Sequence, residues 1–460
     1  SFPILNKNRL MKHNKNTQKN DSRLNRRGFL KSSSAIAGSA SALGSLSIER
    51  GAFAQSSDTI KVALVGCGGR GSGAANQALS TAGDVKLVAM ADAFKDRMDG
   101  SLKGLQKNHG LKADVKDENK FIGFDAYKKA ISMADMVILA TPPGFRPIHF
   151  AEAIKQGKNV FMEKPVAVDG KGVRQVLAAA KEAKKKNLKV GVGLQRHHQL
   201  GYQEVIKRIQ DGAIGDIVSA RSYWNGGGVW VRGRKGYEQA AGRKLTEMEY
   251  QMRNWYYFVW LCGDHIAEQH IHNLDVINWV KGTHPASCQG LGGREVRTGI
   301  DHGEIFDHHA VEYKYPDGSY MFSQCRHIRG CWNSVSEHVQ GTKGRATVSG
   351  PHTLNGNDGK QTWRFPGGGK NPYQQEHDDL FDAIRNDKPY NEAFYGAHST
   401  LTSVMGRMAT YSGKMITADE ALNSEENTMP EVLGWEAAPP TLPDEDGRYA
   451  IPIPGRTKFA

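Results

Sequence analysis

Cysteine is scarce in this sequence, with five residues in a chain of 460. Small secreted domains that depend on disulfides are much richer in cysteine, so the count excludes a disulfide framework, and an odd number leaves at least one thiol free. Cys325 and Cys331 are near enough in sequence to pair, but a chain that folds in a reducing cytoplasm is expected to keep buried thiols. The five are Cys67, Cys262, Cys288, Cys325 and Cys331.

Long hydrophobic runs are also missing, because no apolar stretch approaches the roughly 20 residues that a membrane-spanning helix requires. Dense lysine and arginine stripes are confined to one end: residues 1–54 carry a net charge of +8, which leaves +5 of the formal +13 for the remainder. A nucleic-acid-binding surface needs clustered positive charge. We therefore expect no membrane span and no nucleic-acid partner. The sequence also contains no internal repeat.

The first 54 residues differ in composition from the rest, being rich in asparagine, lysine and serine. They contain Arg26-Arg27-Gly28-Phe29-Leu30-Lys31, then a weakly apolar stretch, and then Ala52-Phe53-Ala54. This order resembles a twin-arginine export signal cleaved after Ala54; a disordered basic tail is the alternative. The signal predicts a periplasmic or secreted protein that is exported in the folded state.

A glycine-rich turn follows the first strongly apolar segment. Residues 60–65 are expected to form a buried strand, and Gly66-x-Gly68-x-x-Gly71 then matches the turn of dinucleotide-binding proteins. The first glycine allows a tight turn, the second lets the backbone approach a pyrophosphate, and the third lets the helix pack on the strand. The free N–H groups at the start of the following helix suit phosphates. The cofactor contacts expected here are Gly66, Gly68, Gly69, Arg70 and Gly71.

A second apolar segment, residues 85–91, ends on Asp92. An acid at this distance from the glycine turn bonds the ribose hydroxyls of adenosine and disfavours a 2′-phosphate, so NAD is preferred as the cofactor. Lys95 and Arg97 are close enough to keep NADP possible.

The order of predicted strands and helices, together with the composition of each segment, predicts an α/β fold in four parts. After the export signal of residues 1–54, strands and helices alternate over 55–183, as in the doubly wound parallel sheet of a Rossmann domain. Longer alternating strands over 184–420 predict a C-terminal α+β domain with a large, mostly antiparallel open sheet. Residues 421–460, rich in proline and acids, are expected to form an extended arm.

Lys164 is a candidate catalytic residue because it follows the apolar segment of residues 159–162. Ligands of such sheets bind at the carboxyl ends of strands, where a lysine could hydrogen-bond a sugar hydroxyl and steady a developing alkoxide. A surface lysine in a turn is the alternative. Thr141 and Pro142 end another apolar strand and are expected to face the cofactor.

Glu268, His272 and Asp275 have the spacing of one helix face. A carboxylate one turn from a histidine can orient it as a general base for removing a hydroxyl proton. A metal site is the weaker alternative, because His270 and His272 point differently on a helix, and no metal is expected. Histidines packed in the core are a further alternative.

Several aromatic and basic side chains could bind a sugar by stacking and hydrogen bonding, although core or interface packing explains them equally well. The candidate substrate contacts are Arg196, Trp230, Arg253, Trp255, Tyr256 and Asp275.

Together these motifs resemble the Gfo/Idh/MocA oxidoreductase family. The matching elements in chain order are the glycine turn, Ala140-Thr141-Pro142, Glu163-Lys164-Pro165, Gln195-Arg196 and Glu268-Gln269-x-x-His272-x-x-Asp275. The resemblance implies an N-terminal Rossmann domain and a C-terminal α/β domain whose open sheet mediates a homo-oligomer, a dimer or a tetramer. It also implies a nicotinamide cofactor and a carbohydrate or cyclitol substrate.

The resemblance assigns roles to individual positions. Lys164 and His272 would be the catalytic pair, Glu268 would tune His272, and Glu163 would lie at the cofactor. Glu268 stands where many members have aspartate, which is a departure from the family pattern. Arg146 stands where many have histidine, so the substrate contact there can differ.

Exported members with a similar glycine turn suggest two activities. One is that of glucose–fructose oxidoreductases, which pass hydride between sugars. The other is that of NAD-dependent glycosidases similar to α-N-acetylgalactosaminidases, which oxidise the sugar, eliminate the aglycone, add water and reduce again. Both recycle a tightly held cofactor, as a protein exported with its cofactor requires. A non-catalytic cofactor-binding sensor is the alternative from another class.

Overall fold

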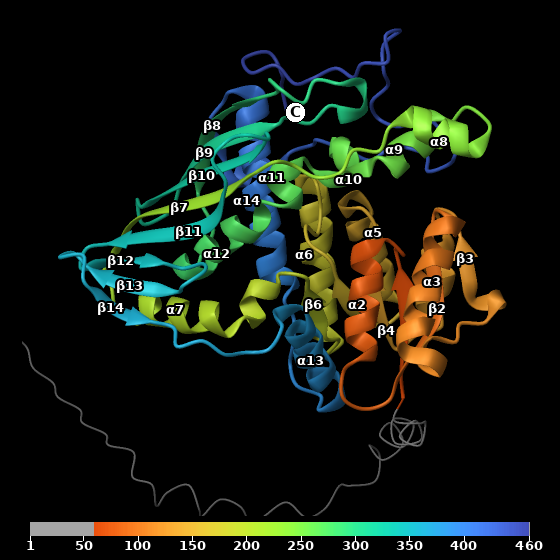
Figure 1. Cartoon of the computed structure of the whole chain (residues 1–460), viewed down its shortest axis with the longest axis horizontal. Helices are drawn as coiled ribbons and strands as arrows, with labels where there is room; N and C mark the ends of the chain where they lie inside the picture. Colours follow the sequence, from red (N-terminus) through yellow and green to blue (C-terminus); the bar gives the residue numbers. More distant parts are fainter. Residues whose placement is uncertain (1–58, 460) are drawn as a thin grey trace, which may run out of the picture. The chain divides into compact units, whose positions relative to one another are not determined.

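The structure is a computed structural model that describes residues Thr59–Phe459, so the predicted export signal lies outside the described residues. The described residues pack together as one unit. Within this unit the elements form two sheets and the helices that cover them (Figure 1).

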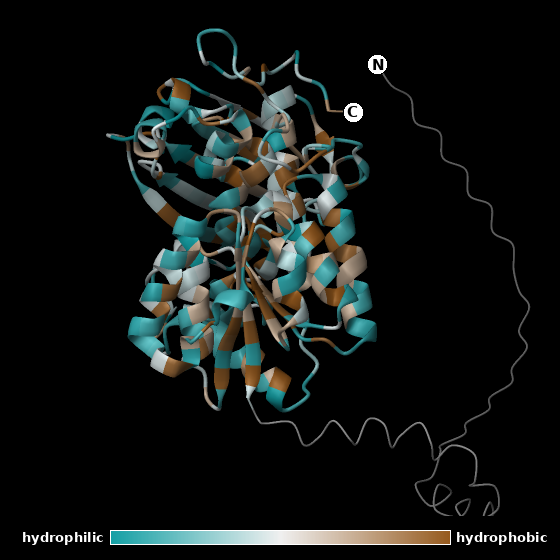
Figure 2. Ribbon diagram, turned by 90° about the vertical axis from the view of Figure 1, so that its right-hand side faces the viewer, coloured by the Kyte–Doolittle hydropathy of each residue, from teal (hydrophilic) through white to brown (hydrophobic). Residues whose placement is uncertain are grey.

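The first sheet has six parallel strands in the order β3-β2-β1-β4-β5-β6. Its strands read as continuous apolar runs because both faces are covered by helices, and Figure 2 shows them as brown ribbons between helices. The order reverses between β1 and β4, which is where dinucleotides bind in this fold. The strands are β1 (Ile60–Val65), β2 (Val85–Asp92), β3 (Lys120–Ile122), β4 (Met136–Leu139), β5 (Asn159–Met162) and β6 (Val190–Val192).

Helices α2, α3 and α13 share one hydrophobic core with one face of this sheet, and α4, α5 and α6 share another core with the opposite face. Helix α13 comes from far along the chain, after most strands of the second sheet. Leu380 and Phe381 of α13 pack in the same core as Leu64 of β1. The bounds are α2 (Gly69–Leu79), α3 (Lys95–His109), α4 (Ala126–Ser132), α5 (Arg146–Lys155), α6 (Gly170–Lys185) and α13 (Pro372–Arg385).

The second sheet has nine strands in the order β14-β13-β12-β11-β7-β10-β9-β8-β15. Neighbouring strands are antiparallel except β7 and β10, which are parallel. The strands are β7 (Ile217–Gly226), β8 (Ser287–Gly293), β9 (His308–Lys314), β10 (Tyr320–His327), β11 (Ser334–Gly341), β12 (Gly344–Thr347), β13 (Thr353–Gly356), β14 (Gln361–Arg364) and β15 (Ile416–Thr417).

Side chains of β9 and β10 alternate between buried and exposed, because helices cover only one face of the second sheet. The long helix α14 packs on β8 and β9 on one side and on α6 on the other, so it lies between the two sheets (Figure 1). The remaining helices are α7 (Leu200–Gln210), α8 (Arg234–Ala241), α9 (Glu247–Arg253), α10 (Val259–Cys262), α11 (His265–Glu268), α12 (Ile271–Lys281), α14 (Ala393–Ser412) and α15 (Ala418–Asn423).

These observations confirm the predicted fold class: a Rossmann-type parallel sheet followed by a mostly antiparallel sheet with helices on one face. All five cysteines lie in the described part of the chain and are free thiols, with only Cys331 exposed. Among residues 59–459, no helix has both the length and the apolar character to cross a membrane.

Candidate active site

The glycine turn joins β1 to α2 and is packed directly against the end of β4. Gly66 has φ +95°, and a β-carbon on it would lie 2.4 Å from the backbone nitrogen of Thr141. A β-carbon on Gly71 would lie 1.9 Å from the carbonyl oxygen of Gly66. Around Gly68 and Gly69, by contrast, the described residues leave open space. The first and third glycines are therefore required by packing, while the middle of the turn leaves room for a pyrophosphate.

A cavity of about 360 Å³ opens at the carboxyl ends of β1, β2 and β4. Gly66, Gly68, Gly69, Arg70, Asp92, Thr141 and Pro142 all line it. Of the predicted cofactor contacts, only Gly71 and Glu163 are not among the lining residues, and the candidate catalytic residue Lys164, also predicted to lie at the cofactor, is not among them either. The size, the glycine cradle and the acid at the end of β2 fit a dinucleotide.

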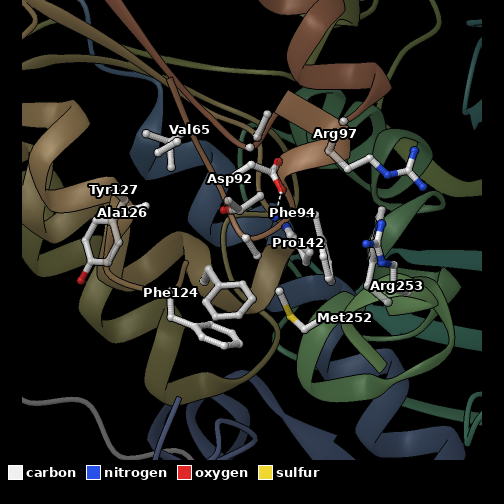
Figure 3. A pocket seen from close by; sticks show the side chains of 18 of the residues that line it. Val65, Asp92, Phe94, Arg97, Phe124, Ala126, Tyr127, Pro142, Met252 and Arg253 are labelled. Atoms are coloured by element: carbon white, nitrogen blue, oxygen red, sulfur yellow. Dashed lines mark hydrogen bonds between the residues drawn. The ribbon is translucent and has the colours of Figure 1, made fainter. Parts of the chain in front are cut away.

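Asp92 is held in place by two backbone N–H groups at the mouth of this pocket. Its carboxylate accepts hydrogen bonds from Cys67 at 2.6 Å and from Phe94 at 2.8 Å. Burial raises the pKa of Asp92 above its ordinary value, and the two N–H donors oppose that effect. In Figure 3, Arg97 and Arg253 lie together on one side of the pocket, and Tyr127 and Phe124 on the other.

Part of the pocket wall is formed by residues from the second half of the chain. Trp230 and Arg232 follow β7, and Met252, Arg253 and Trp255 belong to α9 and the turn after it. Arg253 pairs with Asp96 at 2.8 Å, and its guanidinium lies 3.8 Å from the centre of the Phe94 ring. The predicted substrate residues Trp230, Arg253 and Trp255 therefore line the cofactor pocket.

Trp435, in the predicted C-terminal arm, supports this pocket from behind. Its ring centre lies 5.2 Å from that of Phe94 and 4.7 Å from that of Phe124, and both phenylalanines line the cavity. Sequence reasoning missed all three aromatic residues, because only the fold brings positions 94, 124 and 435 together.

Lys164 follows β5 and donates to the carbonyl oxygen of Glu268, while its Nζ lies 3.2 Å from Glu268 Oε1. The Lys164–Pro165 bond is cis. Burial raises the pKa of Glu268, and the Lys164 charge opposes this effect. Glu268 thus anchors the candidate catalytic lysine.

His272 is 7% exposed and faces Trp224, with ring centres 6.0 Å apart and nearly parallel. Burial lowers the pKa of His272 well below its usual value, and the charges of Lys164 and Arg196 lower it further. Its Nδ1 is buried and has no hydrogen-bond partner among the residues that the structure describes. The ring is therefore neutral at neutral pH and can accept a proton.

The prediction of one continuous helix through Glu268, His272 and Asp275 is wrong. Helix α11 ends at Glu268, α12 begins at Ile271, and the break between them turns Glu268 toward Lys164. Asp275 lies on α12, but its carboxylate is bound by His197 at 2.8 Å and by Ser399 at 2.8 Å.

Arg196 and Tyr256 are also placed differently from the predicted substrate contacts. Arg196 is buried, and its guanidinium is paired with the carboxylate of the buried Glu337 rather than turned toward a substrate. Tyr256 is 2% exposed and packs beside Trp230, with ring centres 5.9 Å apart. Tyr256 therefore supports the pocket wall through Trp230, whereas Arg196 is held in the interior by Glu337.

Arg146 is fully buried and connects the ends of β4 and β5. It donates to the carbonyl oxygen of Thr141 at 2.7 Å and to that of Glu163 at 2.9 Å. Burial lowers its pKa to about 10, so it keeps its charge at neutral pH. The sequence indicated this position only as a departure from the family pattern, whereas the structure shows that Arg146 links the segments after β4 and β5.

Glu163 and Arg70 form a pair beside the glycine turn, with Arg70 Nε 2.7 Å from Glu163 Oε1. A β-carbon on Gly193 would lie 2.5 Å from the Glu163 carboxylate, so the glycine after β6 makes room for this pair. Glu163 therefore acts on the cofactor pocket through Arg70, which lines it.

Residues 60–193 match the model of the GFO_IDH_MocA family, described as an oxidoreductase family with an NAD-binding Rossmann fold. This part of the chain is therefore similar to that family. The match ends at β6, and NAD is the cofactor of this type of domain.

The similarity to curated relatives is moderate and partial. The 2,7-anhydro-N-acetylneuraminate hydratase of Escherichia coli (strain K12) is 27% identical over 232 residues, which cover 47% of this chain and 55% of the relative. The inositol 2-dehydrogenase of Ralstonia nicotianae is 27% identical over 247 residues, which cover 53% of this chain and 61% of that relative. The chain thus spans little more than half the length of these relatives.

Solved structures extend the likeness to the second sheet. The scyllo-inositol dehydrogenase of Lactobacillus casei, with bound NAD(H) and scyllo-inositol, gives a TM-score of 0.56 at 19% identity and covers 78% of this chain and 99% of its own. The Rossmann-type sheet and the sheet that follows it therefore share their fold with this enzyme.

The stacking of Trp435 predicts that the C-terminal arm helps to retain the cofactor. We expect Trp435→Ala to weaken NAD binding by about 10- to 100-fold, because the walls formed by Phe94 and Phe124 lose their support. The measurement is the nicotinamide content of the protein after gel filtration, together with the dissociation constant of NAD. Trp363→Ala, in the edge strand β14, is the matched control; equal cofactor loss in both variants would contradict this role.

Proposed function

We propose that this protein is an exported, NAD-dependent oxidoreductase that acts on a hydroxyl of a sugar, cyclitol or glycoside and recycles its tightly held cofactor. The observation that supports this most is the junction at the end of β5, where Lys164 meets Glu268 and its charge acts on the neutral, buried His272. This junction adjoins the pocket, because Arg146 joins the loop after β5 to the cavity-lining Thr141.

Lys164 and His272 have complementary roles in this proposal. The Lys164 ammonium group donates a hydrogen bond to the oxygen of the reacting hydroxyl and stabilises its developing negative charge. The neutral imidazole of His272 accepts the hydroxyl proton. NAD, when bound, accepts the hydride from the same carbon. Glu268 is a positioning residue that fixes Lys164 through its carbonyl and carboxylate.

The enclosure of the pocket supports tight cofactor retention. Trp230 and Trp255 cover it, and their rings contact each other edge to face at 5.7 Å. Asp92 suits the ribose hydroxyls of NAD, while Arg97 and Arg253 are the residues that would meet a 2′-phosphate, so NADP is the alternative cofactor. Export by the twin-arginine route, with cofactor loaded before transport, remains part of the proposal.

A second candidate function is that of an NAD-dependent glycosidase, which oxidises, eliminates, hydrates and reduces again. It is supported by the relative named 2,7-anhydro-N-acetylneuraminate hydratase, because hydration is one step of that sequence. The same base, His272, would serve oxidation and elimination in turn.

The test is to incubate the purified protein, with no cofactor added, with free sugars, cyclitols and aryl glycosides. Nicotinamide absorbance and aryl alcohol release are followed together. Absorbance change or exchange between sugars without aryl alcohol release would support the oxidoreductase, and release without net NADH would support the glycosidase. Bound cofactor with silence in both assays across the panel would contradict both and support a non-catalytic sensor.

The proposed roles predict a specific pH profile. Because burial and the Lys164 and Arg196 charges keep the pKa of His272 well below 6.5, the base stays unprotonated and kcat/KM should remain level down to pH 6.5.

We expect His272→Asn to lower kcat by about 10²–10⁴-fold with little change in NAD affinity.

In Lys164→Met, loss of one of the charges that lower the pKa of His272 should move the acid limb of the residual activity to higher pH. Lys189→Met is the matched control, since Lys189 pairs with Asp387 instead. An acid limb that is unchanged in Lys164→Met would contradict the proposed coupling.

We further propose that the uncovered face of the second sheet forms a homo-oligomer. Phe322 is 46% exposed and Leu291 is 78% exposed on neighbouring parts of this face, where Tyr320 packs beside Phe322. Phe322→Glu should lower the molar mass measured by light scattering, because it places a charge in an apolar contact. Leu111→Glu, far away on the first domain's surface, should not. An unchanged mass for Phe322→Glu would contradict this interface.

A further inference from the structure

Three fully buried residues lie close together at the start of α11, and none of them lines the cofactor pocket. Asp264 and His265 begin this helix, and His309 comes from β9; all three are 0% or 2% exposed. His265 Nδ1 lies 2.8 Å from Asp264 Oδ1, and His309 Nε2 lies 3.3 Å from Asp264 Oδ2. One nitrogen or oxygen from each of the three lies within 4.8 Å of the others.

Hydrogen bonding within the protein leaves this group incomplete. Both ring nitrogens of His265 and Nε2 of His309 are buried without a well-aligned hydrogen-bond partner among residues 59–459. Buried polar atoms nearly always have a partner, so three such nitrogens around one carboxylate need an explanation. The Asp264 carboxylate itself accepts hydrogen bonds from the backbone N–H groups of His265 and Phe306 and from the Tyr411 hydroxyl. A cation held by Asp264 and by one nitrogen of each histidine would give a partner to two of the three unpaired nitrogens.

The surrounding contacts are those of metal ligands. His309 Nδ1 lies 2.9 Å from the hydroxyl oxygen of Thr410, a contact that holds Nε2 toward Asp264. The Tyr411 hydroxyl donates to Asp264 Oδ2 at 2.5 Å, as outer groups do for ligating carboxylates. Two zinc ligands in tetrahedral geometry lie about 3.3 Å apart, which matches the separation between His309 Nε2 and Asp264 Oδ2, while the 2.8 Å between His265 Nδ1 and Asp264 Oδ1 would have to lengthen.

We propose that Asp264, His265 and His309 bind one divalent transition metal, and zinc is the ion that we test because two imidazoles and one carboxylate are among its ligand sets. This set shares only His265 with the weak alternative that the sequence raised, which combined Glu268 with His265, His270 and His272. His270 Nε2 is instead 2.7 Å from the hydroxyl oxygen of Ser323.

The metal would have a structural role with a consequence for the active site. It would fix the start of α11, and the same short helix ends at Glu268, which holds Lys164. Loss of the metal should therefore lower thermal stability and loosen the lysine without touching the cofactor pocket directly.

The test is the metal content of the full chain, purified from cells grown with added zinc and measured by mass spectrometry of the metals. We expect about one zinc per chain, with a lower Tm after extraction by a chelator and recovery when zinc is returned. His309→Gln should lower the zinc content at least about tenfold, since glutamine is a poor zinc ligand.

His308→Gln is the matched control. His308 is the neighbour of His309 on β9, points to the other face of the sheet and contacts Asp307 at 2.8 Å. It should keep its zinc. Wild-type protein that holds no metal and whose Tm does not change with zinc, manganese or nickel would overturn the proposal, even if the variant fails to fold. Zinc retained in soluble His309→Gln would overturn it as well.

Discussion

The site depends on one buried cation. The Arg146 side chain is fully enclosed, where an unpaired charge is costly, and it is stabilised by the carbonyl oxygens of Thr141 and Glu163. Those two residues follow adjacent strands of the parallel sheet. Their spacing sets both the wall of the cofactor pocket, through Thr141, and the position of Lys164, which comes directly after Glu163. The charges of Glu163 and Glu268 support Arg146 further.

A second constraint is that neither half of the described chain completes the site alone. The Rossmann sheet ends at β6, yet its pocket is roofed by Trp230, Met252 and Arg253, and its outer face is covered by α13. Lys164 from the first half is held by Glu268 from the second. The arm returns last and places Trp435 against Phe94 and Phe124. Cofactor binding and catalysis are therefore coupled to the packing between segments that are far apart in sequence.

The electrostatics of the two candidate catalytic groups follow from the same packing. Burial makes His272 a neutral base, and the nearby Lys164 charge strengthens that preference. The Glu268 carboxylate meets the lysine rather than the histidine, because the break between α11 and α12 turns it toward Lys164.

Local patterns were sufficient for the cofactor half of the fold. The glycine turn, the apolar strands and Asp92 were predictable because each depends on short-range geometry: a turn that only glycine allows, and strands buried on both faces. The hairpin between β9 and β10 was predictable for the same reason, since Pro316-Asp317-Gly318 is a strong turn signal.

The sequence by itself thus determined the Rossmann order, the dinucleotide turn and the identity of Lys164 and His272 as candidates. Only the tertiary structure decided which side chains meet. Helical periodicity placed Glu268 beside His272, but a two-residue break redirected it to Lys164. Arg196 and Asp275 were expected to face substrate. Arg196 is instead paired with the buried Glu337, and Asp275 is bound by His197. Periodicity describes one element at a time, whereas ion pairs, cavities and the group around Asp264 arise from contacts between elements.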